Sequence, residues 1–313
     1  MHIYKHSFEF LYCFDDNFNK QGFTSIISLL ENVSEPISIN VIHPNKDILN
    51  HLPLKISKHP NLKTIVFKTF KNYDYDFPNL DNTHISEATY YRIFMNNYIH
   101  KDVQNIIYID ADIICLENPI KTINEVVEKI HDSDLLISAK TEFHIDSAKD
   151  DTFKRLGITS KYFNAGFMVI NYQKWQKESV QESLLQILKE NYSDIVFWDQ
   201  DILNIYINGK FIELNANLNF YAQLIKINLK NYQPYFIHYV GSKKPWLTSG
   251  AFEICSEVYH SNYRKIYDSE YHIEHKWRYA SLKELLFSIM KLKIFRLDNI
   301  IKYLKEFIVS LKN

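Results

Sequence analysis

The sequence is poor in glycine, with only six glycines in 313 residues. Their spacing matches neither G-x-G-x-x-G nor G-x-x-x-x-G-K-[ST]. These two motifs supply the backbone that cradles phosphate groups in most dinucleotide-binding dehydrogenases and in P-loop NTPases. Both classes are therefore disfavoured. If a nucleotide binds, its phosphates must be neutralised mainly by side chains and by a metal ion.

Cysteine is also scarce, because the chain has only Cys13, Cys115 and Cys255. Three widely separated cysteines form neither a metal-ligand cluster nor a disulfide framework, which is typical of a reducing cytosol. The sequence opens without a signal-peptide core, and no window holds about 18 uninterrupted apolar residues. We therefore expect a cytoplasmic protein with no membrane-spanning helix. The formal net charge of −1 indicates no nucleic-acid partner.

Hydrophobic residues make up 46% of the chain and aromatic residues 15%, which excludes extensive disorder and allows a large core. Strand-like runs alternate with helical periodicity, which predicts an α/β fold with a mostly parallel central sheet flanked by helices. The expected strands are 8–14, 37–42, 62–68, 106–109, 134–139, 166–171 and 235–237, and the expected helices are 23–32, 86–98, 120–130 and 178–190.

The strand expected at 106–109 is followed directly by Asp110, Ala111 and Asp112. In extended backbone, positions i and i+2 point the same way, so the two carboxylates can converge on one point. Convergent carboxylates repel each other unless a cation lies between them, and a hard divalent ion is the usual one. A solvated acidic turn is the simpler alternative, because D-x-D is frequent by chance.

Other polar groups follow expected strands. Asp15, Asp16 and Asn17 come after the first strand and can bind a base or ribose, or simply cap a turn. Segment 163–166 contains an asparagine followed by two small residues, alanine and glycine. Segment 198–201 contains two aspartates and reads as the start of a helix. Residues 238–246 offer His238 as a third metal ligand, followed by a lysine-containing loop that suits phosphate. Each segment also has an ordinary structural interpretation.

Taken in order, these segments resemble the conserved blocks of family 8 glycosyltransferases, which are retaining enzymes of the GT-A fold. The similarity is strongest to bacterial lipopolysaccharide and lipooligosaccharide α-galactosyltransferases. Six blocks between residues 8 and 246 carry it: Asp15-Asp-Asn17, Thr89-Tyr-Tyr-Arg92, Tyr108-Ile-Asp-Ala-Asp112, Phe163-Asn-Ala-Gly166, Asp199-Gln-Asp-Ile-Leu-Asn204 and His238-Tyr-Val-Gly-Ser-Lys-Lys-Pro-Trp246.

The resemblance implies a UDP-hexose donor and a Mn²⁺ or Mg²⁺ ion, with a saccharide or glycolipid acceptor. The implied metal ligands are Asp110, Asp112 and His238. The implied donor-binding residues are Asp15, Asp16, Asn17, Arg92, Asp110, Ala111, Gly241 and Lys244, and the implied catalytic residues are Gln200, Asn164 and Asp199. Family members often have an aspartate after the strand at 137–141 that binds donor hydroxyls. We place Lys140 or Thr141 at that point, which leaves galactose, our first choice, and glucose as possible sugars.

A retaining double displacement needs a carboxylate nucleophile, but the matching position holds the neutral amide of Gln200. We therefore expect front-face attack, in which the acceptor hydroxyl passes its proton to the departing phosphate oxygen. In this interpretation, Gln200 and Asn164 stabilise the ion-pair-like state. Asp199 or Asp201 acting as a nucleophile is the competing interpretation.

The last 38 residues have a different character. Residues 276–313 contain nine Lys or Arg against three Asp or Glu, a net charge of +6. A capping box at Ser281–Glu284 predicts a helix start, and apolar residues from Leu297 to Leu311 recur with helical spacing. We expect a GT-A catalytic domain over 1–250 and a helical basic extension over 251–313. This extension would attach the enzyme peripherally to the anionic inner face of the cytoplasmic membrane, or alternatively pack on its own domain.

Two functions outside this family remain open. A haloacid-dehalogenase-type phosphatase also has D-x-D after a strand, although usually after the first strand. A non-catalytic sugar-nucleotide binding protein would keep the metal site without turnover. Phosphate release from a generic ester distinguishes the first from a transferase, and tight UDP binding without transfer or hydrolysis distinguishes the second.

Overall fold

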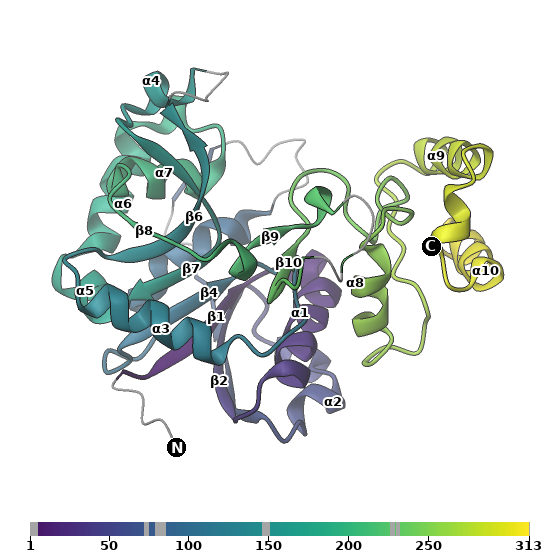
Figure 1. The fold of residues 1–313 in the computed structure, drawn as a ribbon, viewed down its shortest axis with the longest axis horizontal. Helices are drawn as coiled ribbons and strands as arrows, with labels where there is room; N and C mark the ends of the chain where they lie inside the picture. Colours follow the sequence, from purple (N-terminus) through teal and green to yellow (C-terminus); the bar gives the residue numbers. More distant parts are fainter. Residues whose placement is uncertain are drawn as a thin grey trace.

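The computed structural model describes residues 6–71, 75–78, 86–145, 151–225, 229 and 232–312. A seven-stranded sheet of order β3-β2-β1-β4-β7-β6-β8 forms its centre (Figure 1). The strands are β1 Phe8–Cys13, β2 Ile37–His43, β3 Leu62–Thr69, β4 Asn105–Ile109, β6 Ile137–His144, β7 Lys161–Asn171 and β8 Ile212–Glu213.

Four of the six neighbouring strand pairs are parallel, and β7 runs antiparallel to both β4 and β6. This confirms the predicted mostly parallel α/β sheet. The sequences of the inner strands β4 and β7 are largely apolar, because helices pack on both faces of the sheet at these strands. The β4–β7 pairing brings the end of β4 beside Gly166, so two segments far apart in sequence meet at one edge of the sheet.

Helices cover both faces of the sheet. On one face, α1 and α3 pack against apolar side chains of β1, β2 and β4. On the other face, η3, α5, α6 and α7 form a second core. Their bounds are α1 Asn19–Asn32, α3 Ile120–His131, η3 Glu87–Asn97, α5 Tyr172–Lys177, α6 Val180–Glu190 and α7 Trp198–Ile207. Shorter elements are η1 Asp16–Phe18, η2 Ile48–His51, α2 Leu54–Ser57, α4 Thr152–Leu156 and η5 Tyr192–Asp194.

A second, three-stranded sheet of order β5-β10-β9 lies beside the first. Its strands are β5 Ile113–Cys115, β9 Phe220–Tyr221 and β10 Phe236–His238, with η6 Ala216–Leu218 and η7 Ala222–Leu224 beside β9. The antiparallel pairing of β10 with β5 sets His238 opposite Ile113. This small sheet therefore carries a residue from near position 240 to the end of β4.

Several predicted boundaries were wrong. The helix expected at 86–98 is η3, a 3₁₀ segment with a kink at Phe94. The strand expected at 134–139 begins only at Ile137 and continues to His144, and the strand expected at 166–171 begins at Lys161. The helix expected at 178–190 is divided from α5 because Ser179 has a left-handed conformation, with φ of 51°.

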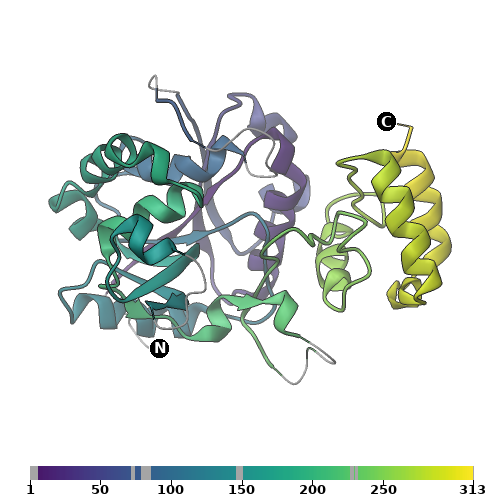
Figure 2. The ribbon, with the colours of Figure 1, turned by 90° about the horizontal axis from the view of Figure 1, so that it is seen from above.

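The chain after residue 250 forms two packing units. Helix α8 (Ser256–Tyr263) contacts α1, and its aromatic side chains share a core with Ile237 and Trp246. Helix α9 (Arg278–Met290), η9 (Lys293–Arg296) and α10 (Ile300–Ser310) form a separate core with Phe252, and lie beyond α8 (Figure 2). The division into 1–250 and 251–313 stays a prediction.

The extension also corrects two details of the sequence reasoning. Helix α9 begins at Arg278, one turn before the expected capping box, so Ser281 and Glu284 lie inside the helix. The apolar stripe from Leu297 to Leu311 divides: Leu297 and Phe307 are buried against the extension's own core, while Ile301 and Ile308 are exposed. Among the described residues, no helix has the length and apolar character needed to cross a membrane.

Candidate active site

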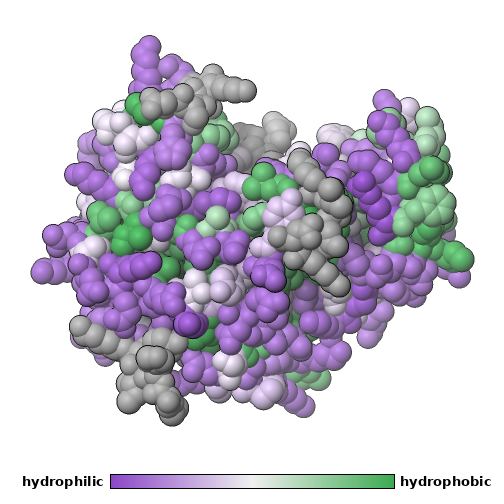
Figure 3. Space-filling view, in the orientation of Figure 1, coloured by the Kyte–Doolittle hydropathy of each residue, from purple (hydrophilic) through white to green (hydrophobic). Residues whose placement is uncertain are grey.

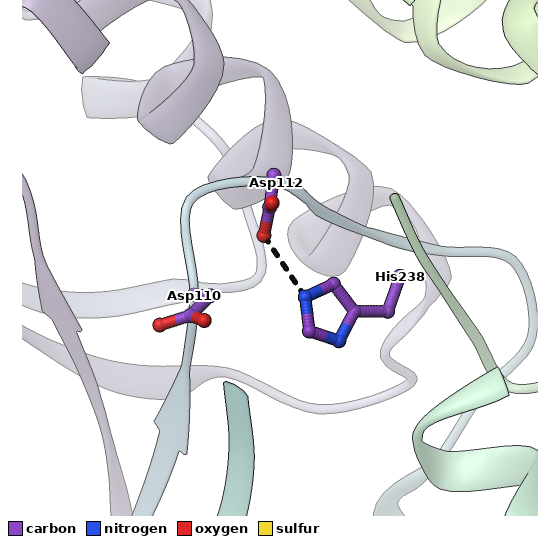
Figure 4. A group of neighbouring side chains, drawn as sticks. All are labelled: Asp110, Asp112 and His238. Carbon is purple, nitrogen blue, oxygen red and sulfur yellow. Dashed lines mark ion pairs between the residues drawn. The ribbon is translucent and has the colours of Figure 1, made fainter. Parts of the chain in front are cut away.

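Three predicted metal ligands converge at the end of β4. One ligand atom from each of Asp110, Asp112 and His238 lies within 4.8 Å of the others (Figure 4). Their side chains are 32%, 13% and 5% exposed, so the group lies in a partly buried pocket and is not a solvated acidic turn. The carboxylates converge because the chain turns after β4, with the Ile113 amide bonded to the Asp110 carbonyl. This turn replaces the extended geometry expected from the sequence.

The donor set fits a divalent ion. The buried Oδ1 of Asp112 accepts no hydrogen bond within the described part of the chain, and lies 3.3 Å from His238 Nε2. Two carboxylates and an imidazole suit Mn²⁺, and Mg²⁺ less well because it prefers oxygen ligands. Gly166 keeps this space open, because a Cβ there would lie 2.4 Å from His238 Cε1 and 2.8 Å from Asp110 Oδ2.

A lysine and an arginine flank the two aspartates. Burial alone would raise the pKa of Asp112, but the adjacent Lys244 ammonium and His238 hold it below its usual range. Lys244 also donates to the carbonyl of Tyr239 at 2.6 Å. Burial raises the pKa of Asp110, and Arg92 opposes that rise. The site thus combines a carboxylate pair with fixed positive charges on both sides.

Asn219 connects the metal triad with the predicted sugar-facing residues. Its side-chain oxygen lies 2.9 Å from His238 Nδ1, and its amide nitrogen donates to Asn164 Oδ1 at 3.0 Å. If Nδ1 carries the proton and donates to Asn219, the lone pair of Nε2 faces the aspartates, as a metal ligand requires. Asn219 is fully buried. Sequence reasoning missed it because it belongs to none of the recognised blocks.

Arg92 occupies the centre of a buried ion-pair network. Its guanidinium donates to both carboxylate oxygens of Asp199, to the carbonyl of Ala165 at 2.7 Å, and to Asp110 at 3.4 Å. Thr89 donates a further hydrogen bond to Asp199. Asp199 is fully buried and both of its oxygens are engaged. Asp199 therefore holds Arg92 in place. It lacks the exposure that a nucleophile needs.

Gln200 and Asn164 lie together, as predicted, but with a third partner that the sequence analysis did not place there. The Gln200 side chain accepts from the Ala165 amide at 3.0 Å and donates to Tyr162 Oη at 3.1 Å. Glu142 Oε2 lies 3.3 Å from the amide nitrogens of both Gln200 and Asn164. A carboxylate therefore faces this part of the site.

The structure places Glu142 beside Gln200 and Asn164, where the sequence analysis expected Lys140 or Thr141. The pairing of β6 with β7 is irregular between Ala139 and Lys140 and again between Thr141 and Phe143. A bulge changes which side chain faces the site. Lys140 instead donates to the carbonyl of Asn219 at 2.8 Å, and Thr141 bonds Glu213. The irregular strand thus delivers Glu142 one position later than expected.

The remaining predicted residues lie around this centre. Ala111 lines a cavity of about 80 Å³ together with Asp110, Asp112, Thr89 and, from β1 and its turn, Cys13, Phe14 and Phe18. Gly241, with φ of 76°, lies in the exposed loop three residues after His238.

Asp15, Asp16 and Asn17 are outside the residues that line this cavity. Asp15 caps the following turn by accepting from the Asn17 amide, and Asp16 accepts from Asn45. The turn-capping interpretation is thus confirmed for Asp15. Their contact with a base stays a prediction.

The architecture is that of a GT-A glycosyltransferase. The crystal structure of galactosyltransferase LgtC in complex with donor and acceptor sugar analogs superposes with a TM-score of 0.70 and 20% identity, covering 86% of this chain and 99% of that one. The structure of the glycosyltransferase GlyE from Streptococcus pneumoniae is also similar, with a TM-score of 0.59 and 16% identity over 91% of this chain and 65% of that one.

The sequence places the chain more narrowly. Residues 9–250 match the model of glycosyl transferase family 8. The protein therefore belongs to glycosyltransferase family 8, and it is an enzyme that transfers a sugar from a donor to an acceptor. The matched region contains every residue of the site described above, and ends before the helices of the extension.

Among curated relatives, general stress protein A of Bacillus subtilis is 25% identical over 273 residues, which cover 79% of this chain and 90% of that protein. The lipopolysaccharide 1,3-galactosyltransferase of Salmonella typhimurium is 29% identical over 53% of this chain, and the lipopolysaccharide glucosyltransferase WaaO of Escherichia coli is 30% identical over 51%. The last two alignments span about half the length of those relatives, 51% and 49%.

We expect Asn219→Ala to weaken Mn²⁺ binding ~10–100-fold, the usual cost of losing a group that orients a metal-bound histidine. The reason is that His238 Nδ1 would lose its partner and Asn164 would lose a donor. Isothermal titration of Mn²⁺ in the presence of UDP measures the effect. Asn215→Ala, an exposed cap in the same loop, is the matched control and should bind normally. Equal Mn²⁺ affinity of Asn219→Ala and the wild type would contradict the orienting role.

Proposed function

We propose that this enzyme is a retaining, metal-dependent hexosyltransferase that uses a UDP-sugar. Galactose is the favoured hexose and glucose the next. The observation that carries the proposal is the convergence of Asp110, Asp112 and His238 beside Lys244. Hydrogen bonds through Asn219 join this group to Asn164, which in turn contacts Gln200. The names of the Salmonella and Escherichia relatives support a saccharide acceptor of the lipopolysaccharide-core type.

Breaking the anomeric C–O bond of a UDP-sugar places negative charge on the departing diphosphate. A divalent ion held by the triad would supply Lewis-acid stabilisation of that charge. Lys244, which already lies at Asp112, adds a fixed positive charge where the leaving group gains its own. Asp110 and Ala111 line the cavity at the end of β4, and Gly241 is proposed to contact the diphosphate through its backbone. Asp15, Asp16 and Asn17 are proposed to contact the uridine from the end of β1.

The sugar side of the site is built from amides and one carboxylate. Asn164, Gln200 and Arg92 are the proposed sugar-facing residues, and Glu142 is added to them by the geometry. Glu142 is positioned to accept hydrogen bonds from sugar hydroxyls, since its carboxylate lies at the amide groups of Asn164 and Gln200. It takes the role that the sequence analysis assigned to a missing aspartate, and is a determinant of the donor hexose in this proposal.

The proposed chemistry is front-face attack. Asp199 is closed off by Arg92, and Asp201 is buried with oxygens bonded to Arg155 and Tyr162. The acceptor hydroxyl therefore passes its proton to the phosphate oxygen that leaves, while Gln200 stabilises the positive charge on the sugar through its amide oxygen. Within the described part of the chain, Glu142 is the other carboxylate in contact with Gln200, so it is the described residue on which a double displacement would proceed.

The first test is a screen of UDP-galactose, UDP-glucose, UDP-N-acetylglucosamine and UDP-N-acetylgalactosamine for Mn²⁺-dependent hydrolysis. One UDP-hexose should be consumed, and EDTA should abolish this activity. Asp112→Asn and His238→Ala should each reduce it by at least ~10²-fold, as expected when electrostatic stabilisation of the leaving group is lost. Circular dichroism checks the fold of each variant. Full activity in EDTA, or release of phosphate from a generic phosphate ester, would contradict the proposal.

The second test addresses the stereochemical course. Gln200→Ala should lower kcat by ~10–10³-fold, the range for a lost transition-state contact, without abolishing turnover. Glu142→Gln should change the preference between UDP-galactose and UDP-glucose and retain turnover. Mass spectrometry of the enzyme quenched during turnover should find no glycosylated peptide. A covalent sugar on Glu142, Asp199 or Gln200 would overturn front-face attack.

We further propose that the extension binds an anionic membrane surface. Large apolar side chains on α9, η9 and α10 are exposed, among them Leu286 at 61%, Met290 at 78%, Phe295 at 71% and Ile301 at 69%. Hydrophobic side chains gather over the outer edge of this part of the molecule (Figure 3). Within the extension, residues 276–313 carry a net charge of +6. Basic residues beside exposed apolar ones favour a surface of anionic lipid.

Met290→Glu combined with Phe295→Glu should reduce binding to anionic phosphatidylglycerol vesicles by at least ~10-fold, since burial of each side chain contributes about 1.5–3 kcal/mol. Vesicle sedimentation measures this. Leu54→Glu is the matched control, because Leu54 is 69% exposed on α2 and lies outside the extension. Hydrolysis of the UDP-sugar should be unchanged in both variants. Equal sedimentation of the double variant and the wild type would refute membrane binding by this surface.

A further inference from the structure

A second cavity, of about 560 Å³, lies between the loop after β10 and the C-terminal extension. Val240, Gly241 and Lys243 line one side of it, and Glu253, Lys293 and Arg296 line the other. Its volume lies within the range of about 300–1,000 Å³ that is usual for small-ligand sites. None of the metal triad lines it.

The charges of this cavity do not balance. Among the described residues that line it, Glu253 is the one carboxylate. It lies 3.2 Å from Lys243, 3.3 Å from Lys293 and 3.9 Å from Arg296. Three cations around one carboxylate leave an excess of two positive charges facing the cavity. These lysine ammoniums remain accessible, since the side chains of Lys243 and Lys293 are 65% and 32% exposed.

The backbone of the loop adds donors to the same cavity. In the part of the chain that the structure describes, the amides of Ser242 and Lys243 donate no hydrogen bond. Gly241 has φ of 76°, a conformation that turns the chain sharply at this point. The loop therefore presents free N–H groups beside cationic side chains, which together favour an oxyanion.

The cavity is also close to the reaction centre. Gly241 follows His238 by three residues, and three residues of extended chain reach at most about 11 Å. A ligand in this cavity can thus extend a sugar hydroxyl toward the donor while its other end rests on Lys293 and Arg296. Arg296 is held in place by a hydrogen bond to the carbonyl of Phe252 at 3.0 Å.

We propose that this cavity binds a phosphate group of the acceptor, which deepens the proposed hexosyltransferase function and rests on it. A phosphate monoester carries a charge of about −1.5 to −2 at pH 7. It therefore matches the two excess cations better than a carboxylate does. The phosphate displaces Glu253 from Lys293 and Arg296. The extension thus has two roles, since it binds the acceptor phosphate and also carries the exposed apolar surface.

The test uses the full-length enzyme with its donor site filled by UDP and Mn²⁺. Isothermal titration compares glucose 6-phosphate with glucose and glucuronate as probes. The wild type should bind glucose 6-phosphate at least ~10-fold more tightly than either, as charge-assisted hydrogen bonds provide. Lys293→Ala combined with Arg296→Ala should remove this preference. Lys293→Ala alone is a milder variant for the fold. It keeps Arg296, which also donates a hydrogen bond to the carbonyl of Phe252.

The matched control is Lys283→Ala combined with Lys305→Ala, which removes two exposed cations from the same extension outside the cavity. It should keep the preference. Glu253→Gln should bind glucose 6-phosphate more tightly than the wild type, because the competing carboxylate is gone. No preference in the wild type, equal binding of glucuronate, equal loss in the control, or weaker binding by Glu253→Gln would each overturn the proposal.

The phosphate can belong to the sugar or to a diphosphate that links the sugar to a lipid. A glucosyl diphosphate on a short prenyl chain, in detergent micelles, distinguishes these sources. Tighter binding of this compound than of glucose 6-phosphate assigns the linkage, and weaker binding assigns the sugar phosphate. UDP-sugar hydrolysis by the variants should remain at the wild-type rate. Absence of that hydrolysis in the wild type would refute the hexosyltransferase function itself, separately from phosphate binding.

Discussion

The buried guanidinium of Arg92 is the contact on which the arrangement of the site depends. It joins Asp199 of α7, the carbonyl of Ala165 in β7 and Asp110 after β4, while Arg92 itself lies in η3. One side chain thus links four segments that are far apart in sequence. Removing one partner of such a buried pair typically costs about 3–5 kcal/mol, because the other charge is left without solvent. The carboxylates of Asp199 and Asp110 keep their positions because this cation binds both of them.

Much of the fold and the metal triad could be predicted from the sequence, because both depend on local patterns. The apolar run at 106–109 marks a buried strand, and the aspartates that follow it must lie at a strand end. His238 follows another short strand. Predicting that the aspartates and His238 lie close together requires the order of strands in the sheets, and the spacing of residues in the sequence does not give this order. The resemblance to family 8 supplied that order, and the pairing of β10 with β5 explains it physically.

The residues that sequence reasoning missed depend on non-local geometry. Glu142 reaches Gln200 and Asn164 only because β6 pairs irregularly with β7, and alternation along an ideal strand assigns its neighbours instead. Asn219 has no motif around it, and its importance comes from two hydrogen bonds to residues 19 and 55 positions away. In the extension, the apolar stripe from Leu297 to Leu311 had the correct period. Its division between a buried and an exposed side depended on packing against Phe252.

The neutral amide at Gln200 follows from the charge already present around it. Glu142 lies 3.3 Å from the Gln200 amide nitrogen, and Asp199 and Asp201 flank it in sequence. A further carboxylate at position 200 would place like charges side by side in a partly buried site and would be protonated or displaced. An amide instead donates to Tyr162 and Glu142 while its oxygen accepts from the Ala165 amide. The polar groups around Gln200 therefore disfavour a nucleophilic carboxylate at this position, which is the physical reason to propose front-face attack.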